Sequence, residues 1–197
     1  MVRVISGKAK GRKLFSVPGT GTRPITDRVK EALFNILGPR VQDSLWLDLF
    51  AGTGSVGVEA LSRGAERVVF VDKAHQAIRT LQRNLDLTGF EDQAEVVRGD
   101  AMRYIDRANE DTGFDYIYVA PPQYRELWAE ALTKLDAKPL LASEGLIIVQ
   151  IHPRELGPIT LQRLELLSER RYGSTLLLFY GERAGYTGET ETDASPS

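Results

Sequence analysis

The sequence predicts an α/β fold with a mostly parallel sheet whose last strand is antiparallel, and three observations indicate it. Short apolar runs rich in β-branched residues alternate with stretches of helical periodicity. A glycine-rich turn separates the first long apolar run from the helical stretch after it. Near the C-terminus two apolar runs follow each other with no helical stretch between them. Alternating strands and helices imply parallel pairing through right-handed crossovers, whereas successive strands imply a hairpin.

The composition is that of an ordinary globular protein. Of 197 residues, 42% are hydrophobic and 26% charged, which suits one domain of moderate size. There is no cysteine, which excludes disulfides and thiolate ligands, and His75 and His152 lie in separate elements, so we expect no metal. No run is long enough to span a bilayer and the N-terminus lacks a signal-peptide core. A cytoplasmic protein without a membrane partner is expected.

The first 40 residues are strongly basic. They hold nine Lys or Arg and two acids, a charge of +7, so the remaining chain carries −9 for the total of −2. A basic segment on an acidic body favours an anionic partner, nucleic acid first, although a solvated basic terminus has the same composition. The candidate RNA-binding residues are Arg3, Lys8, Lys10, Arg12, Lys13, Arg23, Arg28 and Lys30.

Two elements are predicted in this basic extension. Residues 2–15 alternate imperfectly around glycines, which predicts a short hairpin with basic side chains facing outward. Thr26 is the expected N-cap of the following helix, with Asp27 supporting its positive end. Arg28 and Lys30 are expected to lie off the buried stripe of this helix. That stripe is predicted to consist of Val29, Ala32, Leu33, Ile36 and Leu37.

The next stretch reads as a strand, a turn and a helix. Residues 45–49 form a mostly apolar run, as expected of a strand covered on both faces. Gly52 and Gly54 stand where a tight turn needs positive φ, and Ser55 is expected to cap the helix that follows. A helix N-terminus at the carboxyl end of a strand offers free backbone N–H groups to a ligand.

The remaining elements complete one sheet. Strands are predicted at 68–71, 94–97, 114–119, 145–151, 161–167 and 174–180, and helices at 78–87, 102–108 and 126–135. Five parallel strands closed by a hairpin that inserts one antiparallel strand is the Rossmann-like layout of class I methyltransferases. We expect a basic extension over 1–40, a methyltransferase domain over 41–183 and a disordered tail over 184–197.

Residues 52–57 match the dinucleotide fingerprint G-x-G-x-x-G, and Asp72 ends the next strand, where an acid binds ribose hydroxyls. These features fit NAD and S-adenosyl-L-methionine equally, and the glycines alone also fit a plain tight turn. Asp48 favours S-adenosyl-L-methionine, because a carboxylate there attracts an ammonium but repels a pyrophosphate. Asp100 is placed to accept from the adenine amino group. The predicted cofactor-binding residues are Asp48, Phe50, Ala51, Gly52, Thr53, Gly54, Gly57, Asp72, Lys73, Asp100 and Ala101.

A double proline follows the fourth predicted strand, which is expected beside the first strand and next to the methyl donor. Each proline fixes φ and removes a backbone donor, so the carbonyl of Ala120 is free to accept from an exocyclic amine. A rigid loop without further role has the same sequence, and Tyr124 either stacks on a base or packs in the core. The predicted catalytic residues are Ala120, Pro121, Pro122, Gln123 and Tyr124.

Four stretches resemble the bacterial 16S rRNA (guanine-N2)-methyltransferase family: RVISG at 3–7, KGRKL at 10–14, RPITDRVKEALFN at 23–35 and DLFAGTGS at 48–55. The order of elements extends the resemblance to about Tyr180. The part before the glycine turn discriminates, since generic class I methyltransferases lack it. The resemblance implies methylation of guanine N2 in 16S rRNA, either naked or in a small-subunit assembly intermediate, by a monomer. A flipped-out base is the expected substrate pose.

One departure from the family pattern concerns the expected catalytic turn. The family has Asp-Pro-Pro followed by an aromatic residue, whereas this chain has Ala120, two prolines and Gln123. Losing that carboxylate would cost on the order of a hundredfold or more in rate. We hypothesise that the Ala120 carbonyl and the Gln123 side chain hold the amine instead. The alternatives are a catalytically weak or inactive RNA-binding protein and, disfavoured by Asp48 and the lack of a substrate domain, an NAD-binding oxidoreductase.

Overall fold

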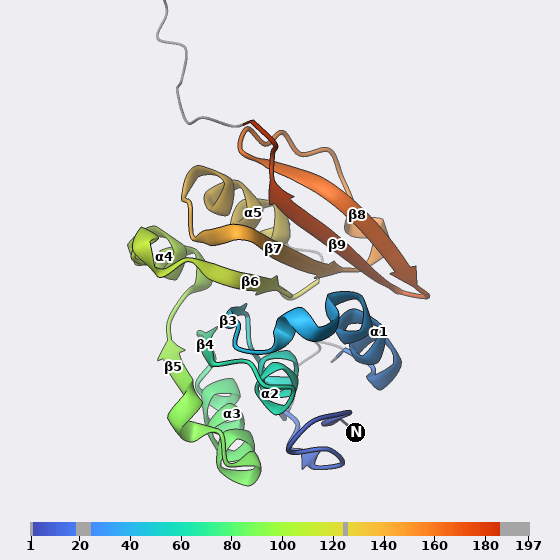
Figure 1. Ribbon diagram of the computed structural model, residues 1–197, viewed down its shortest axis with the longest axis vertical. Coiled ribbons are helices and arrows are strands. Elements are labelled where there is room, and N and C mark those ends of the chain that lie inside the picture. The colour runs from blue at the N-terminus through green and yellow to red at the C-terminus, as the bar shows by residue number, and fades with distance from the viewer. Residues whose placement is uncertain (1, 19–24, 124–125, 186–197) are drawn as a thin grey trace, which may run out of the picture.

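A seven-stranded sheet forms the centre of the molecule in the computed structural model, which describes residues 2–18, 25–123 and 126–185 (Figure 1). The strand order is β5-β4-β3-β6-β7-β9-β8. The strands from β5 to β7 pair in parallel, and β9 is antiparallel to both of its neighbours. The predicted sheet with an antiparallel last strand is therefore confirmed. The strands are β3 (Leu45–Leu49), β4 (Arg67–Asp72), β5 (Ala94–Arg98), β6 (Phe114–Val119), β7 (Leu141–Ile151), β8 (Leu164–Tyr172) and β9 (Thr175–Glu182).

Helices cover both faces of this sheet (Figure 1). Trp46, Phe70 and Tyr118 point to the face that packs with buried residues of α1, α2 and α3. Leu47 and Ile117 point to the opposite face, which packs with α4 and α5. Because both faces are covered, the central strands are mostly apolar, with Asp48 in β3 and Asp115 in β6 as exceptions. The helices are α1 (Asp27–Leu37), α2 (Ser55–Ser62), α3 (His75–Thr88), α4 (Ala101–Arg107) and α5 (Leu127–Ala137), with 3₁₀ turns at Gly38–Val41, Glu91–Gln93, Glu110–Thr112 and Pro153–Glu155.

The basic extension contains the predicted hairpin, formed by β1 (Val2–Arg3) and β2 (Lys13–Leu14). Its apolar side chains, including Val4 and Ala9, belong to the same core cluster as the residues of α1 and α2. The hairpin is also joined to α2 by backbone bonds, such as that from Lys8 N to Ser62 O at 2.8 Å. The extension thus packs directly against the sheet domain.

Helix α1 begins as predicted, because the Thr26 side chain accepts from Val29 N at 3.3 Å. The buried stripe differs from the prediction at four positions, since Lys30 and Phe34 are buried while Ala32 and Ile36 are not. Ile36 is 41% exposed, while Lys30 is fully buried. The stripe runs through residues 29, 30, 33, 34 and 37, since α1 packs against the hairpin as well as the sheet. The helical spacing of the apolar residues had placed Lys30 off that stripe.

The cap of α2 also differs from the prediction. Gly54, with φ of 73°, is the N-cap residue, and Ser55 is the first residue of the helix. The Ser55 hydroxyl instead accepts a hydrogen bond from Lys30 Nζ at 3.0 Å. The prediction that Ser55 caps the helix is therefore wrong, because a tertiary partner occupies its side chain. The predicted tail over 184–197 lies outside the described residues apart from its first two positions.

Candidate active site

A cavity of about 870 Å³ extends along the carboxyl ends of the parallel strands. It lies at the ends of β3 and β6, the two strands between which the strand order reverses, which is the usual ligand position in an open α/β sheet. Its far wall is formed by the start of α1 and by the turn between β8 and β9. Predicted site residues lining it are Asp48, Phe50, Ala51, Gly52, Thr53, Asp72, Lys73, Asp100, Ala101, Ala120, Pro121, Pro122 and Gln123. One cavity thus brings most of the predicted cofactor and catalytic residues together. Gly54 and Gly57 do not line it, and Tyr124 lies outside the described residues.

Two glycines shape the turn after β3 without lining the cavity. A Cβ at Gly54 would lie 2.2 Å from Leu81 Cδ1, and φ there is 73°. A Cβ at Gly57 would lie 2.2 Å from Phe70 Cε1. Any larger residue would push the turn away from α3 and β4. Phe50 has a φ of 62°, a conformation that bulky residues adopt rarely and that marks many ligand sites.

Asp48 is the buried carboxylate of this site. It is 2% exposed, and its Oδ2 accepts from Gly57 N at 3.2 Å. Burial raises the pKa of the Asp48 carboxyl well above its usual range, the Gly57 hydrogen bond opposes this rise, and the charge of Asp72 adds to it. A cationic ligand group at the cavity wall would reverse this shift and stabilise the ionised form.

The other two predicted acids bind backbone groups as well as facing the cavity. Asp72 Oδ2 accepts from Gly52 N at 2.9 Å, which fixes the glycine turn to the end of β4. Asp100 caps α4, its Oδ1 accepting from Met102 N at 3.0 Å and from Arg103 N at 3.2 Å. Sequence reasoning treated both acids as ligand acceptors only. Their backbone bonds hold each carboxylate in one orientation at the cavity.

Two residues that sequence reasoning missed stand beside the double proline. Tyr118 OH donates to Gln150 Oε1 at 2.5 Å, and both side chains line the cavity. Burial raises the pKa of the Tyr118 phenol well above its usual value, and the nearby charge of Asp48 adds to this. Tyr118 pairs with Asp48 across β3 and β6. A tyrosine two residues before Ala120, near the end of a predicted strand, was the available signal for Tyr118, whereas nothing local marked Gln150.

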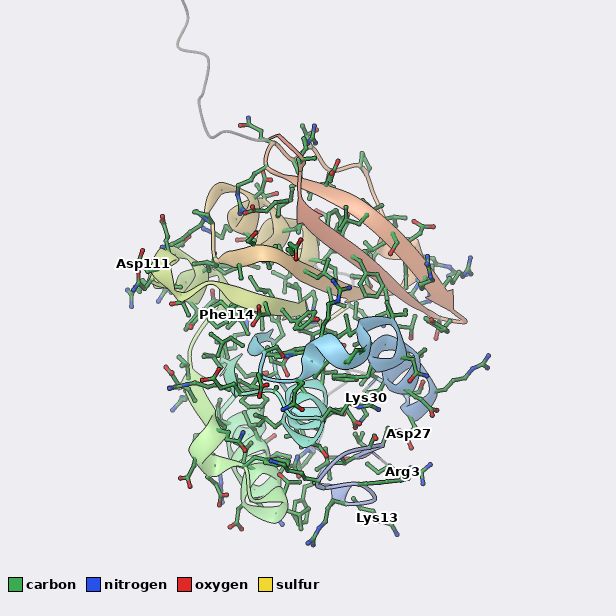
Figure 2. All side chains as sticks on the ribbon, viewed as in Figure 1. Arg3, Lys13, Asp27, Lys30, Asp111 and Phe114 are labelled. Carbon is green, nitrogen blue, oxygen red and sulfur yellow. The ribbon has the colours of Figure 1, made fainter. Side chains whose placement is uncertain are left out.

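Most of the predicted RNA-binding residues lie on the surface of the extension. Lys8, Lys10, Arg12 and Lys13 of the hairpin region are exposed, as are Arg3 and Arg28. Arg28 also lines the cavity, so the basic surface reaches its mouth. Arg3 and Lys13 lie on the outer side of the hairpin, and Arg3 points toward Asp27 (Figure 2). The Arg3–Asp27 ion pair is 2.7 Å long, and Arg23 lies outside the described residues.

Lys30 cannot contact RNA, and its prediction is wrong. It is fully buried between α1 and α2 (Figure 2), where its Nζ donates to Arg3 O at 2.6 Å and lies 3.4 Å from Glu59 Oε2. Glu59 also accepts from Ile5 N at 2.8 Å, from Ser6 N at 3.0 Å and from Arg63 Nε at 2.8 Å. Burial lowers the pKa of Lys30, and the Glu59 charge opposes this. A charge count cannot separate such a structural cation from a surface one.

Comparison with known proteins assigns this chain to a family. Residues 2–181 match the family model described as Conserved hypothetical protein 95. The chain belongs to this family. Ribosomal RNA small subunit methyltransferase D of Escherichia coli K12 is 35% identical over 192 residues, covering 98% of this chain and 94% of that protein. The YlbH protein of Bacillus subtilis is 42% identical over 184 residues, covering 92% of this chain and all of that protein.

Solved structures show the same fold as this member of the Conserved hypothetical protein 95 family. The yhhF protein of Escherichia coli superimposes with a TM-score of 0.81 at 34% identity, over 93% of this chain and 98% of that chain. Hypothetical protein TTHA0928 of Thermus thermophilus gives 0.78 at 32% identity, over 91% and 98%. The expected Rossmann-like class I methyltransferase fold is confirmed.

The structure also locates the two histidines. His75 begins α3, and His152 caps the 3₁₀ turn after β7, where its Nδ1 accepts from Arg154 N at 3.1 Å. Across residues 2–18, 25–123 and 126–185, no three or more His, Cys, Asp or Glu side chains gather as metal ligands would. No helix in these same ranges has the length and apolar character needed to cross a bilayer.

Proposed function

We propose that this protein transfers a methyl group from S-adenosyl-L-methionine to the exocyclic N2 of a guanine in small-subunit rRNA. The observation that carries the proposal is the single cavity that joins the glycine turn to the Ala120–Gln123 turn. Relatives named ribosomal RNA small subunit methyltransferase D, at 35% and 36% identity, support rRNA as the substrate. The proposed setting is the cytoplasm, where ribosomal subunits are assembled.

The residues of the cavity fit this cofactor. Asp72 and Asp100 offer carboxylate oxygens, the acceptors that ribose hydroxyls and an adenine amine require. Asp48 offers a buried carboxylate at the cavity, which a cation such as the methionine ammonium would stabilise in its ionised form. The same carboxylate would repel the pyrophosphate of NAD. Bound S-adenosyl-L-methionine supplies a methyl group already activated by its sulfonium charge.

The protein then mainly has to position the acceptor amine. Pro121 is buried and cannot donate a backbone hydrogen bond, so the Ala120 carbonyl stays fixed at the end of β6 beside β3. We assign that carbonyl and the exposed Gln123 amide to holding guanine N2. Conjugation keeps this amine in the plane of the base, so holding the base in the correct orientation near the methyl donor raises the rate of methyl transfer. The base has to leave its pair to enter the cavity, because N2 lies in the minor groove.

Ala120 supports a second candidate function, that of an RNA-binding protein with little catalysis. A chain that lacks the family's carboxylate at this position could bind RNA and cofactor with little catalysis, since one lost acceptor costs on the order of a hundredfold. The Gln123 side chain is the substitute acceptor in our proposal. Methyl transfer that depends on Gln123 would therefore separate the two functions.

The experiment measures methyl transfer to small ribosomal subunits taken from cells that lack this gene. Purified protein and labelled S-adenosyl-L-methionine are added, and nucleosides are analysed by mass spectrometry. N2-methylguanosine is expected with the native protein, with about tenfold or lower yield for Gln123→Ala, in line with a lost transition-state hydrogen bond. Gln82→Ala, an exposed position on α3 away from the cavity, is the matched control. Absence of N2-methylguanosine with the native protein would contradict the proposal, and an active Gln123→Ala would remove Gln123 from its role.

A further inference from the structure

We infer that Gln150, oriented by Tyr118, reads the O6 carbonyl of the target guanine and thereby selects a 6-oxopurine. The inference rests on the proposed function and specifies how its substrate base is recognised. Tyr118 and Gln150 both line the cavity next to the double proline. They are joined by the 2.5 Å hydrogen bond from Tyr118 OH to Gln150 Oε1.

The tyrosine determines which end of the amide faces the ligand. Tyr118 is 3% exposed, so its hydroxyl proton needs an acceptor inside the protein, and Gln150 Oε1 provides it. The amide nitrogen is then turned away from the ring. Within the part of the chain that the structure describes, Gln150 Nε2 makes no hydrogen bond, although every fully buried side-chain N or O atom there has a partner. Nε2 is therefore accessible from the cavity and presents two donor hydrogens to it.

The register of the sheet places this donor beside the amine site. Ala120 directly follows β6, and Gln150 lies near the end of the neighbouring strand β7. Adjacent strands are spaced by roughly 4.8 Å. Guanine carries N2 and O6 on one edge, separated by ring atom N1. A base whose N2 donates to the Ala120 carbonyl on the β6 side can therefore place O6 against Gln150 on the β7 side.

The chemistry of this pair discriminates between purines. Guanine presents an acceptor at O6, whereas adenine presents an amine donor at the same position. An amide N–H pointing at that position binds the first and opposes the second. The cavity would thus use an acceptor for the reacting amine and a donor for the carbonyl, and Tyr118 prevents the amide from rotating to exchange these roles.

The test compares two RNAs that share the reacting amine. The methylated guanine is mapped first, and short RNAs are made with guanine or 2,6-diaminopurine at that position, the latter having an amine in place of O6. The native enzyme is expected to prefer guanine in kcat/KM by on the order of tenfold to a hundredfold. Gln150→Ala should lower kcat/KM for guanine by a similar factor and change that for diaminopurine less than threefold. Gln150→Glu, which presents acceptors only, should favour diaminopurine.

The controls separate this inference from the proposed function and from misfolding. Tyr118→Phe should weaken the preference for guanine in the same direction as Gln150→Ala. Gln82→Ala should leave kcat/KM unchanged on both RNAs. Affinity for S-adenosylhomocysteine, measured by calorimetry, should stay within about threefold in all variants, since Gln150 lies at the end of the cavity opposite Asp100. Equal losses on both RNAs, or no loss, would overturn the role of Gln150. Failure of the native enzyme to methylate guanine would instead overturn the proposed function.

Discussion

Replacing Lys30 by methionine tests the buried connection between the basic extension and the sheet domain. The variant removes an ammonium that donates to Arg3 O and to Ser55 Oγ and lies 3.4 Å from Glu59. Removing one partner of a buried ion pair costs about 3–5 kcal/mol because the other charge is left uncompensated. Glu59 keeps two backbone donors and Arg63, so we expect a loss of stability just below that range, at about 2–3 kcal/mol. Glu59→Gln should destabilise the protein more than Lys30→Met does, since it leaves the fully buried Lys30 charge without its carboxylate.

Urea unfolding followed by tryptophan fluorescence measures this loss. Trp46 is fully buried between Phe34 and Tyr116, with ring centroids 5.6 Å and 4.6 Å away, so its emission reports the core beside α1. For a chain of this length the loss corresponds to a decrease of roughly 5–10 °C in Tm. The matched control is Arg28→Met on the same helix, an exposed position where stability should change by less than about 0.5 kcal/mol.

RNA binding should be affected in the reverse pattern, with a loss in Arg28→Met and none in Lys30→Met. Arg28→Met should weaken RNA binding and lower the slope of log affinity against log salt, with one phosphate contact worth about 0.7–0.9. Lys30→Met should leave that slope unchanged, because its ammonium never reaches the surface. Native stability together with a lowered salt slope in Lys30→Met would refute the reasoning, since it would show an exposed lysine that binds RNA.

Three further substitutions test the site itself. Asp48→Asn should weaken S-adenosylhomocysteine binding in calorimetry yet stabilise the free protein. Because the folded-state pKa of Asp48 is raised, its contribution to stability is fully present below the ordinary pKa of 3.8 and is lost as the pH rises through the folded pKa. The gain in Tm from Asn should therefore be small at low pH and grow toward neutral pH, and a gain independent of pH would contradict this. Gly57→Ala should destabilise by at least about 1–3 kcal/mol in urea, because the new methyl meets the Phe70 ring at 2.2 Å, and an unchanged midpoint would show that the helix shifts freely. Ala120→Asp restores a carboxylate at the amine site and should raise kcat for guanine methylation by about tenfold or more, whereas a decrease would mean that the turn is adapted to its alanine.

The topology was predictable because it depends on periodicity and on turn residues. Apolar runs of strand length, separated by helical stretches, permit few arrangements once crossovers are right-handed. The glycine turn at 52–57 was visible because glycine is required where Gly54 has positive φ and where Gly57 contacts an aromatic ring. Asp48, Asp72 and Ala120 reached one cavity for the same reason, since each lies at the end of a parallel strand and those ends share one edge of the sheet.

What each polar side chain binds was decided by tertiary structure alone. Lys30 and Ser55 were assigned from local rules, yet the packing of two helices brought these residues, 25 positions apart in sequence, to 3.0 Å and gave both a different role. No local pattern marks Gln150, because its proposed role depends on β7 lying beside β6 and on the 2.5 Å hydrogen bond from Tyr118 OH to its Oε1. Sequence alone therefore determined the succession of strands and helices and the edge where the ligand is expected to bind, since both follow from backbone geometry. The partners of buried lysines, serines and amides depend on distances across the fold, which no local pattern encodes.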